Sequence, residues 1–288
     1  MRAADVQAFH NSVDDPEATL AQSALLMSRI EYPGLDVQFY VNRLDRMGEE
    51  ARVHVERARE HAGTAAPDVA ALASYVYGVL GFSGNRVSYD DPHNSLLNQV
   101  IDRRTGIPIT LAVVLLEVGA RAGVRLEGVN FPGHFLLRGF SPGVPGKGIV
   151  LVDPFNDGAV LSESDCAALL PSEAGDRSAL TPEMFATAGK REILVRMLLN
   201  IKRAYLRQHS FPQARDAVDL LLELDPTLMS EVRDRGLLSY RLGHLAAALR
   251  DFERYLQVPP DDDPGTRADH EQMWEQVKGL RKRIAGFN

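Results

Sequence analysis

The segment 109–122 constrains the fold more than any other part of the sequence. Written as a helix, it is apolar around nearly its whole circumference, with Ile109, Leu111, Ala112, Val113, Val114, Leu115, Leu116, Val118 and Ala120. A helix that is apolar on most sides is buried on most sides. The run is shorter than the about 20 residues that a membrane-spanning helix needs. The sequence therefore predicts a core helix that other layers of the chain cover.

The pattern changes after Gly123 to short runs typical of β-strands. These runs cover residues 124–131, 134–140 and 148–155, and clusters of Pro and Gly separate them. Helices followed by a strand meander indicate an α+β domain with a small antiparallel sheet. We expect this core domain to cover residues 86–175.

The residues before the core have the spacing of amphipathic helices. Asp15-Pro16-Glu17 has the pattern of a helix start, with a capping residue, a proline and an acid in the first turn. Apolar residues at intervals of three to four then predict helices over residues 37–61 and 67–80. The first 85 residues are thus predicted to be an N-terminal helical subdomain, 1–85.

The tail contains an internal repeat. Ala214 and Ala248, Leu224 and Val258, and Pro226 and Pro260 are each 34 residues apart, which is the tetratricopeptide period. Such repeats bury their faces only by stacking, so a helix over residues 266–284 is expected to cap them. The sequence predicts an α-helical tetratricopeptide-repeat domain over residues 183–288, with an unrelated helical bundle as the alternative.

Composition limits the classes of partner and compartment. The net charge of −7 gives no overall attraction to nucleic acid or to an anionic membrane. The N-terminus lacks the layout of a signal peptide, and one cysteine forms neither an internal disulfide nor a multi-cysteine zinc site. We therefore expect a cytoplasmic protein that uses no cofactor or metal and binds neither nucleic acid nor membrane.

His134 and Asp153 form the first candidate pair for chemistry. If a loop over residues 141–148 joins their strands, the midpoint between the two residues falls inside it. Facing side chains of antiparallel strands lie close enough for a carboxylate to orient an imidazole. This arrangement supplies the base and its orienting group in a catalytic triad. A structural histidine and an Asp-Pro turn are the simpler interpretation of the same residues.

Four ordered motifs, followed by the repeats, give the chain a family resemblance. They are Asp91-Pro92-His93-Asn94-Ser95-Leu96-Leu97-Asn98, Arg103-Arg104-Thr105-Gly106-Ile107-Pro108-Ile109-Thr110-Leu111, Pro132-Gly133-His134-Phe135 and Val152-Asp153-Pro154-Phe155. The chain resembles bacterial transglutaminase-like proteins of the SirB-one group. The resemblance implies a mostly helical α+β fold with a papain/transglutaminase-like core.

The resemblance also implies a departure at the nucleophile. Active members of the wider superfamily place a cysteine at the start of the core helix, next to a His and an Asp on strands. Here the position of that cysteine falls at or beside Pro108. Thr110 and Ser95 offer hydroxyl groups nearby, but the motif places neither as a nucleophile. Cys166 follows an apparent helix start and is expected to be a small, partly buried side chain.

Asn94, Asn98, Arg103, Arg104 and Pro108 are candidates for lining a polar binding cleft, as the family pattern implies. An Asn before a helix is also a common N-cap, and paired arginines often form a solvated face. A zinc site at His93, His134 and Asp153 has no support from ligand spacing.

Two hypotheses for function follow from these residues. In the first, the chain is a regulatory or protein-binding module that lacks the usual catalytic Cys and recognises a protein or peptide partner through its repeats. In the second, it is a hydrolase or acyl-transfer enzyme that uses His134 and Asp153 with a non-cysteine nucleophile or an activated water. We favour the first, because Pro108 carries no nucleophile.

Overall fold

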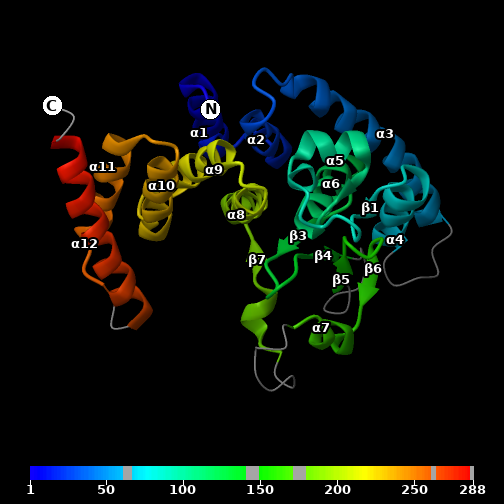
Figure 1. The fold of residues 1–288 in the computed structure, drawn as a ribbon. Coiled ribbons are helices and arrows are strands. Elements are labelled where there is room, and N and C mark those ends of the chain that lie inside the picture. Colours follow the sequence, from blue (N-terminus) through cyan, green and yellow to red (C-terminus); the bar gives the residue numbers. More distant parts are fainter. Residues whose placement is uncertain (61–66, 141–148, 171–179, 261–263, 286–288) are drawn as a thin grey trace. The chain divides into compact units, whose positions relative to one another are not determined.

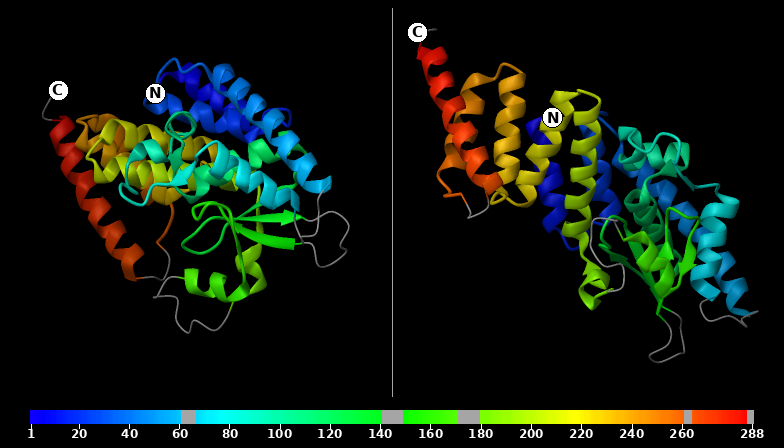
Figure 2. Two further views of the ribbon diagram at one scale, coloured as in Figure 1. Left: turned by 90° about the vertical axis from the view of Figure 1, so that its right-hand side faces the viewer. Right: turned by 60° about the horizontal axis from the view of Figure 1, so that its bottom comes forward.

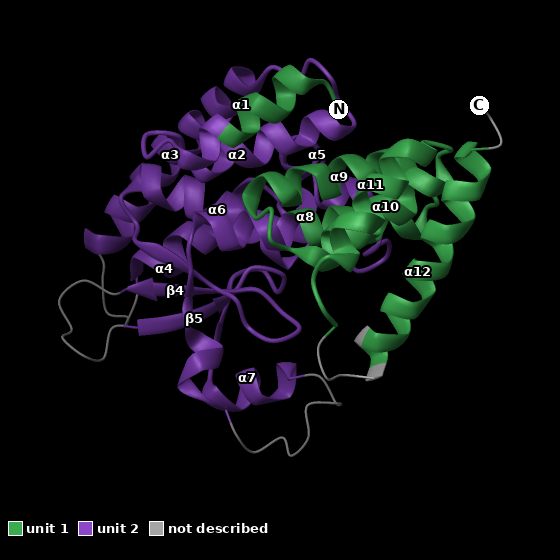
Figure 3. Cartoon of the chain, turned by 90° about the vertical axis from the view of Figure 1, so that its left-hand side faces the viewer, with its two compact units in different colours: residues 1–10, 198–288 green, residues 11–197 purple. Residues whose placement is uncertain are grey.

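The computed structural model describes residues 1–60, 67–140, 149–170, 180–260 and 264–285 (Figure 1). The chain divides into two compact units, residues 11–197 and residues 1–10 with 198–288 (Figure 3). The predicted loop 141–148 and the predicted boundary at residue 175 lie outside the described residues. The predicted division at 1–85, 86–175 and 183–288 remains a prediction.

The first helices of the chain confirm the helical N-terminal region but correct its start. A helix already covers the residues before Asp15, and the next helix begins after Thr19 rather than at Pro16. Thr19 accepts a hydrogen bond from the Gln22 amide, and the Gln22 side chain accepts one from the Thr19 amide. This reciprocal capping box fixes the helix start more strongly than a proline in the first turn does. The elements are α1 (Ala3–Asp14), α2 (Leu20–Met27), η1 (Ser28–Ile30), α3 (Val37–Glu60), α4 (Pro67–Ala73) and η2 (Ser74–Val79, a π-helical turn).

Helix α6 (Pro108–Ala122) is the predicted core helix. Most of its side chains are buried, and it packs against α3 and the sheet. Pro108 is its first residue, where the missing amide hydrogen costs no helical hydrogen bond. Gly123 ends it in the left-handed conformation, with φ of 74°. Before it come η3 (Pro92–Asn94), α5 (Leu97–Arg103) and the short parallel strands β1 (Ser83–Gly84) and β2 (Thr105–Gly106).

The sheet confirms the predicted antiparallel meander and extends it by a strand at each edge. Its order is β6-β5-β4-β3-β7, and all of its pairs are antiparallel. The three predicted strands are shorter than expected: β3 (Leu126–Val129), β4 (Leu136–Phe140) and β5 (Ile149–Asp153). The added edge strands are β6 (Ala159–Leu161) and β7 (Thr187–Ala188). The edge strands escaped prediction because two or three residues are too few for an alternating pattern to be read.

The sheet has a helical layer on each side (Figures 1 and 2). Helix α6 lies on one face, and α7 (Glu163–Leu169) lies on the other, near η4 (Pro182–Phe185). The second layer has its own apolar cluster, in which Cys166 and Leu170 pack with Val129, Phe131 and Leu136. Helical layers therefore cover part of each face of the sheet, while Ile149 and Val160 near its edge stay exposed.

From α8 onward, every described element of the tail is a helix, whereas residues 187–188 of the predicted repeat domain form β7 of the core sheet. Helix α9 packs on α10, α10 on α11 and α11 on α12, so that each helix contacts its neighbours in sequence. Gly236 in α10 allows this packing, because a Cβ there would lie 2.5 Å from the Phe252 ring. The predicted last helix is confirmed as α12. The elements are α8 (Lys190–Arg207), α9 (Phe211–Leu224), α10 (Met229–Arg241), α11 (Leu245–Leu256) and α12 (Pro264–Ala285).

None of the described helices combines the length and the apolar character that crossing a membrane requires.

Candidate functional site

His134 and Asp153 lie in contact, as their spacing predicted. The Nε2 atom of His134 is 2.8 Å from Oδ1 of Asp153. His134 sits at the end of a tight turn in which its amide donates to the Phe131 carbonyl, and Gly133 has a φ of 72°. Asp153 is the last residue of β5. An ionised carboxylate only accepts hydrogen bonds, so Asp153 holds the Nε2–H tautomer of His134.

The predicted register of this pair is wrong by two residues. Leu137 pairs with Val152, so Asp153 is in line with Leu136 rather than with His134. His134 precedes β4 and meets Asp153 diagonally, beyond the end of the ladder. Diagonal neighbours in antiparallel sheets are still within reach of long side chains. The contact therefore depends on the turn at residues 131–134 as well as on the sheet.

The pair is largely, but not completely, sealed from solvent. The side chain of His134 is 13% exposed and that of Asp153 is 7% exposed. Asp153 Oδ1 also accepts the Phe155 amide at 2.8 Å. Tyr77 approaches from the helical layer, and its hydroxyl donates to the Pro154 carbonyl at 2.6 Å. The burial of Tyr77, with the nearby charge of Asp153, raises the pKa of its phenol well above the usual value.

Arg196 fixes the turn that carries His134. Its guanidinium donates to the carbonyl of His134 at 2.7 Å and to that of Phe131 at 3.3 Å. It also bonds the Asn130 side chain and lies over the Phe135 ring, with its Cζ 5.4 Å from the ring centroid. The planar guanidinium holds its donors in a fixed fork, and NH1 and NH2 each reach one of these two carbonyls.

Phe155 connects the pair to the segment 85–94. Its ring contacts His134 on one side, with centroids 6.4 Å apart, and Tyr89 on the other, at 5.8 Å. Arg86 lies over the same ring at 4.9 Å. Asn94, which is completely buried, donates to the carbonyls of Ser88 and Tyr89 at 2.7 and 3.2 Å. Asn94 thus supports the loop that covers Phe155.

Pro108 and Thr110 lie at the start of α6. Thr110 is fully buried, and its hydroxyl donates to the Asn94 carbonyl at 2.7 Å and accepts the Ile107 amide at 3.1 Å. These bonds make Thr110 a capping residue of α6. Ser95 is buried as well. A nucleophilic role for Thr110 stays a prediction, and its hydrogen bonds do not favour it.

The remaining cleft candidates have different hydrogen-bond partners, and their role in a cleft stays a prediction. Asn98 is buried, and its Oδ1 has no hydrogen-bond partner among the described residues. Arg103 pairs with Asp91 at 3.0 Å, and Asp91 also contacts the His93 ring nitrogen at 2.7 Å. Burial raises the pKa of Asp91, but hydrogen bonds from His93 and the charges of His93 and Arg103 outweigh it, so the net pKa is lowered. Arg104, with φ of 54°, bonds the Leu80 carbonyl instead.

Cys166 is fully buried rather than partly buried. Burial, together with the charges of Asp165, Asp153 and Glu163, raises the pKa of its thiol. Reactive cysteines have the opposite environment, which is electropositive and accessible. Cys166 therefore behaves as an apolar residue of the layer under the sheet.

Within the described ranges, no group of three or more His, Cys, Asp or Glu side chains is arranged to hold a metal ion.

The sequence reasoning missed Arg196, Tyr89 and Phe155. Phe155 is the last residue of the Val152–Phe155 motif, and Tyr89 directly precedes the Asp90-Asp91-Pro92 run. Their position in or beside these motifs could have identified both residues. No sequence pattern indicated Arg196, because it lies 62 residues from His134 on an amphipathic helix.

Comparisons with known proteins agree with this architecture. The model of the transglutaminase-like superfamily matches residues 38–199, and a tetratricopeptide-repeat model matches residues 201–277. Human F-box only protein 21 is 32% identical over 182 residues, which are 60% of this chain and 28% of that protein.

Bacterial relatives match over most of their length. A UPF0162 protein of Xylella fastidiosa (strain Temecula1) is 40% identical over 254 residues, covering 86% of this chain and 87% of that protein. A UPF0162 protein of Vibrio cholerae is 30% identical over 243 residues, covering 84% and 87%. The chain therefore belongs to the transglutaminase-like superfamily, in the group of the UPF0162 proteins, and carries tetratricopeptide repeats after its core.

Proposed function

We propose that this protein is a regulatory or protein-binding module, in which the tetratricopeptide repeats recruit a protein partner and the transglutaminase-like core lacks the usual catalytic Cys. We also propose that the protein is located in the cytoplasm and that it belongs with the SirB-one group that its motifs resemble. The observation that carries it is the repeat region itself, since stacked repeats form extended surfaces for peptides.

The exposed residues of α10 support this role. Leu237 and Tyr240 are large apolar side chains exposed on one face of the helix, three residues apart. Trp274, 34 residues after Tyr240, is exposed on α12. Aromatic side chains are enriched among the residues that dominate binding energy at protein interfaces. We call Leu237 and Tyr240 the repeat face.

The test compares the full chain with a variant of the repeat face. Partners cross-linked to the wild type are identified, purified and titrated against wild type and a Leu237→Glu/Tyr240→Glu variant by calorimetry. We expect the variant to bind at least tenfold more weakly, because charges replace apolar contacts. Val79→Glu, in the other unit and also exposed, is the matched control and keeps full affinity. Equal binding by all three proteins would refute the proposal.

The second candidate function is hydrolysis or acyl transfer at His134. It is favoured by one observation, the 2.8 Å contact that orients an imidazole still 13% exposed. In this mechanism His134 takes a proton from a water or an amine while that nucleophile attacks a carbonyl carbon, and then gives the proton to the leaving amine as its bond to that carbon breaks. Asp153 stabilises the resulting imidazolium.

This candidate is tested with two probes, incorporation of a fluorescent amine into casein and release of p-nitroaniline from aminoacyl anilides. Wild type, His134→Asn and Asp153→Asn are compared after their folding is checked by circular dichroism. A rate above background in wild type that falls at least about a hundredfold in His134→Asn supports catalysis, in line with the usual contribution of a general base. Equal rates in all three proteins reject it.

A further inference from the structure

His93 lies between two carboxylates that come from different parts of the chain. Its Nδ1 atom is 2.7 Å from Oδ1 of Asp91, and its Nε2 atom is 3.2 Å from Oε1 of Glu31. Asp91 caps η3, to which His93 belongs, whereas Glu31 directly follows η1. The imidazole therefore connects the N-terminal helices to the segment in front of α5. We call these two contacts the His93 strap.

Both contacts of the strap are favourable only when the imidazole carries two protons. The hydrogen bond to Asp91 uses the proton on Nδ1, because an ionised carboxylate only accepts. In the neutral ring, Nε2 then carries a lone pair, which would face the carboxylate of Glu31. In the protonated ring, Nε2 carries a hydrogen and the positive charge attracts both carboxylates. Protonation of His93 therefore decides whether Glu31 is held.

Asp91 keeps its charge while the ring gains or loses its second proton. Burial opposes the ionisation of Asp91, but hydrogen bonds from His93 and the charges of His93 and Arg103 outweigh burial and lower its pKa. Arg103, at the end of α5, lies 3.0 Å from Oδ2 of the same carboxylate. Asp91 thus remains available as the fixed end of the strap.

Two further groups adjoin the strap. Burial and then the charge of Glu31 raise the pKa of the Tyr32 phenol, so Tyr32 stays neutral. Asp102, whose charge also acts on Tyr32, is paired with Arg43. Histidine is the side chain whose charge ordinarily changes between about pH 5 and 8. His93 is therefore the group through which pH acts on this cluster.

The segment that the strap holds also supports the loop 85–90. The amide of Asp91 donates to the Ser88 carbonyl at 3.2 Å, and the Asn94 side chain donates to the carbonyls of Ser88 and Tyr89. Tyr89 contacts the ring of Phe155, which lies against the candidate catalytic pair. Loosening of η3 would therefore loosen the loop that covers this pair.

We propose that the His93 strap is a proton-operated device, which fixes the loop 85–90 when His93 is protonated and loosens it when the ring loses one proton and releases Glu31. The strap acts on access to His134, and it stands independently of what the repeats bind.

The test measures amide hydrogen exchange of the full chain by NMR at about pH 5.5 and about pH 8, on either side of the usual histidine range. Each rate is compared with that of an unprotected amide at the same pH, which gives a protection factor. The amides of Ser88 and Asp91, which bond the Asn85 side chain and the Ser88 carbonyl, report on the loop. We expect about threefold greater protection at the lower pH, the size of effect that partly exposed ion pairs produce.

Two variants remove the strap by different routes. In Glu31→Gln the ring loses one of its two carboxylates, and in His93→Gln the side chain is neutral at every pH. In both variants the protection of the Ser88 and Asp91 amides should be the same at the two pH values. Glu49→Gln, at an exposed position of α3, is the matched control and keeps the wild-type difference.

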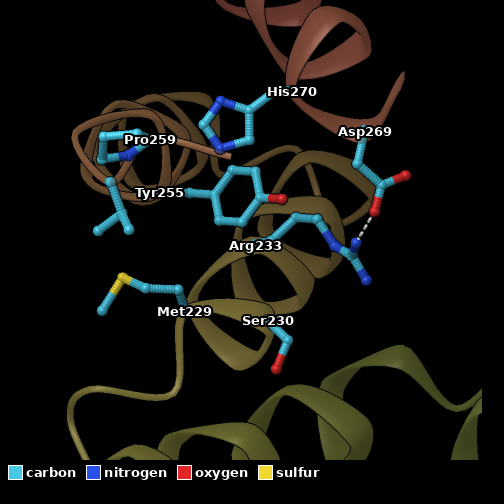
Figure 4. A pocket seen from close by; sticks show the side chains of 8 residues that line it. Met229, Ser230, Arg233, Tyr255, Pro259, Asp269 and His270 are labelled. Atoms are coloured by element: carbon cyan, nitrogen blue, oxygen red, sulfur yellow. Dashed lines mark hydrogen bonds and ion pairs between the residues drawn. The ribbon is translucent and has the colours of Figure 1, made fainter. Parts of the chain in front are cut away.

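The ring signals of the histidines test the coupling from the other side. At about pH 6.5 a smaller fraction of His93 should be protonated in Glu31→Gln than in wild type, because a nearby carboxylate favours the charged ring. His270, whose ring lies against that of Tyr255 in the tail (Figure 4), is the internal control and should keep the same protonated fraction in both proteins.

Three outcomes overturn the proposal. The first is equal protection of Ser88 and Asp91 at the two pH values in wild type. The second is loss of the difference in Glu49→Gln as well as in Glu31→Gln. The third is an equal change of protection at the amides of α6, since the whole core would then respond to pH. None of these measurements involves a partner or turnover, so failure of the proposed function leaves their result unchanged.

Discussion

Oδ1 of Asp153 accepts two hydrogen bonds at the same distance of 2.8 Å, one from the ring of His134 and one from the amide of Phe155. The carboxylate thus joins the turn before β4 to the turn after β5. Because Asp153 is 7% exposed, water cannot easily replace it if it is removed.

Replacing Asp153 with Ala leaves the Phe155 amide and the His134 ring without their acceptor. We expect a loss of about 1–3 kcal/mol in the free energy of unfolding, the usual cost of unsatisfied buried donors. Urea denaturation, followed by far-UV circular dichroism, measures this loss of stability. Glu49→Ala, at an exposed position of α3, is the control and changes stability by less than about 0.5 kcal/mol. Equal stabilities of the two variants would contradict this account of Asp153.

Arg196 positions His134 through backbone carbonyls rather than through the ring. Arg196→Met is expected to lose about 1.5–3 kcal/mol of stability, in the range of hydrogen bonds from charged groups. Arg196→Lys keeps the charge but lacks the planar fork whose two nitrogens each reach one carbonyl, so it recovers only part of the loss. The ¹⁵N signals of the His134 imidazole should move in both variants. Unchanged His134 signals in Arg196→Met would show that the turn holds its shape without the guanidinium.

Cys166 should resist thiol reagents in the folded protein. Burial raises the pKa of its thiol, so a smaller fraction of it is ionised at pH 8.5 than of a free cysteine, which is about half ionised there. Reaction with Ellman's reagent at this pH should be at least about a hundredfold slower in the native protein than in urea. Its rate should rise with pH beyond the range in which an exposed thiol levels off. Rapid native labelling at pH 7 would contradict the burial of Cys166.

Two glycines within helices of the tail should respond with opposite signs to the same substitution. Gly236→Ala places a methyl group 2.5 Å from the Phe252 ring and is expected to destabilise the unit by about 1–3 kcal/mol. Gly279→Ala, where nothing lies within 4 Å of the new methyl group, should stabilise α12 by about 0.5–1 kcal/mol. Thermal unfolding of both variants provides the comparison, and a stabilising effect at Gly236 would contradict the packing of α10 on α11.

Lys202 forms ion pairs with two carboxylates inside the repeat unit. Its Nζ lies 2.7 Å from Glu231 and 2.6 Å from Asp234, and Lys202 and Glu231 are buried. Lys202→Met removes the cation bound to Glu231 and leaves Asp234 paired with Arg233 alone, which should cost about 3–5 kcal/mol. Hydrogen exchange of the α10 amides locates the loss, since the two units need not unfold together. Arg203→Met, at the exposed neighbouring position, is the control and should leave this exchange unchanged.

Several elements followed from the sequence because their patterns are local. The apolar run at 109–122 identified α6, because apolar residues at almost every position predict a helix buried on most sides. The 34-residue spacing identified the repeats, because stacked units recur at a fixed period. The pairing of His134 with Asp153 followed from their spacing around a loop. Its register did not, because strand alternation predicts which residues share a face but not where His134 leaves the ladder.

The remaining parts of the site depend on tertiary structure. Arg196 reaches the turn of His134 across 62 residues, and Phe155 lies between His134 and Tyr89 although no periodic pattern connects these positions. By itself the sequence determined the helices, the meander and the repeat, which arise from local periodicity. Only the tertiary structure decided which distant side chains share a hydrogen bond or a cavity, because packing brings together residues that no local interval relates.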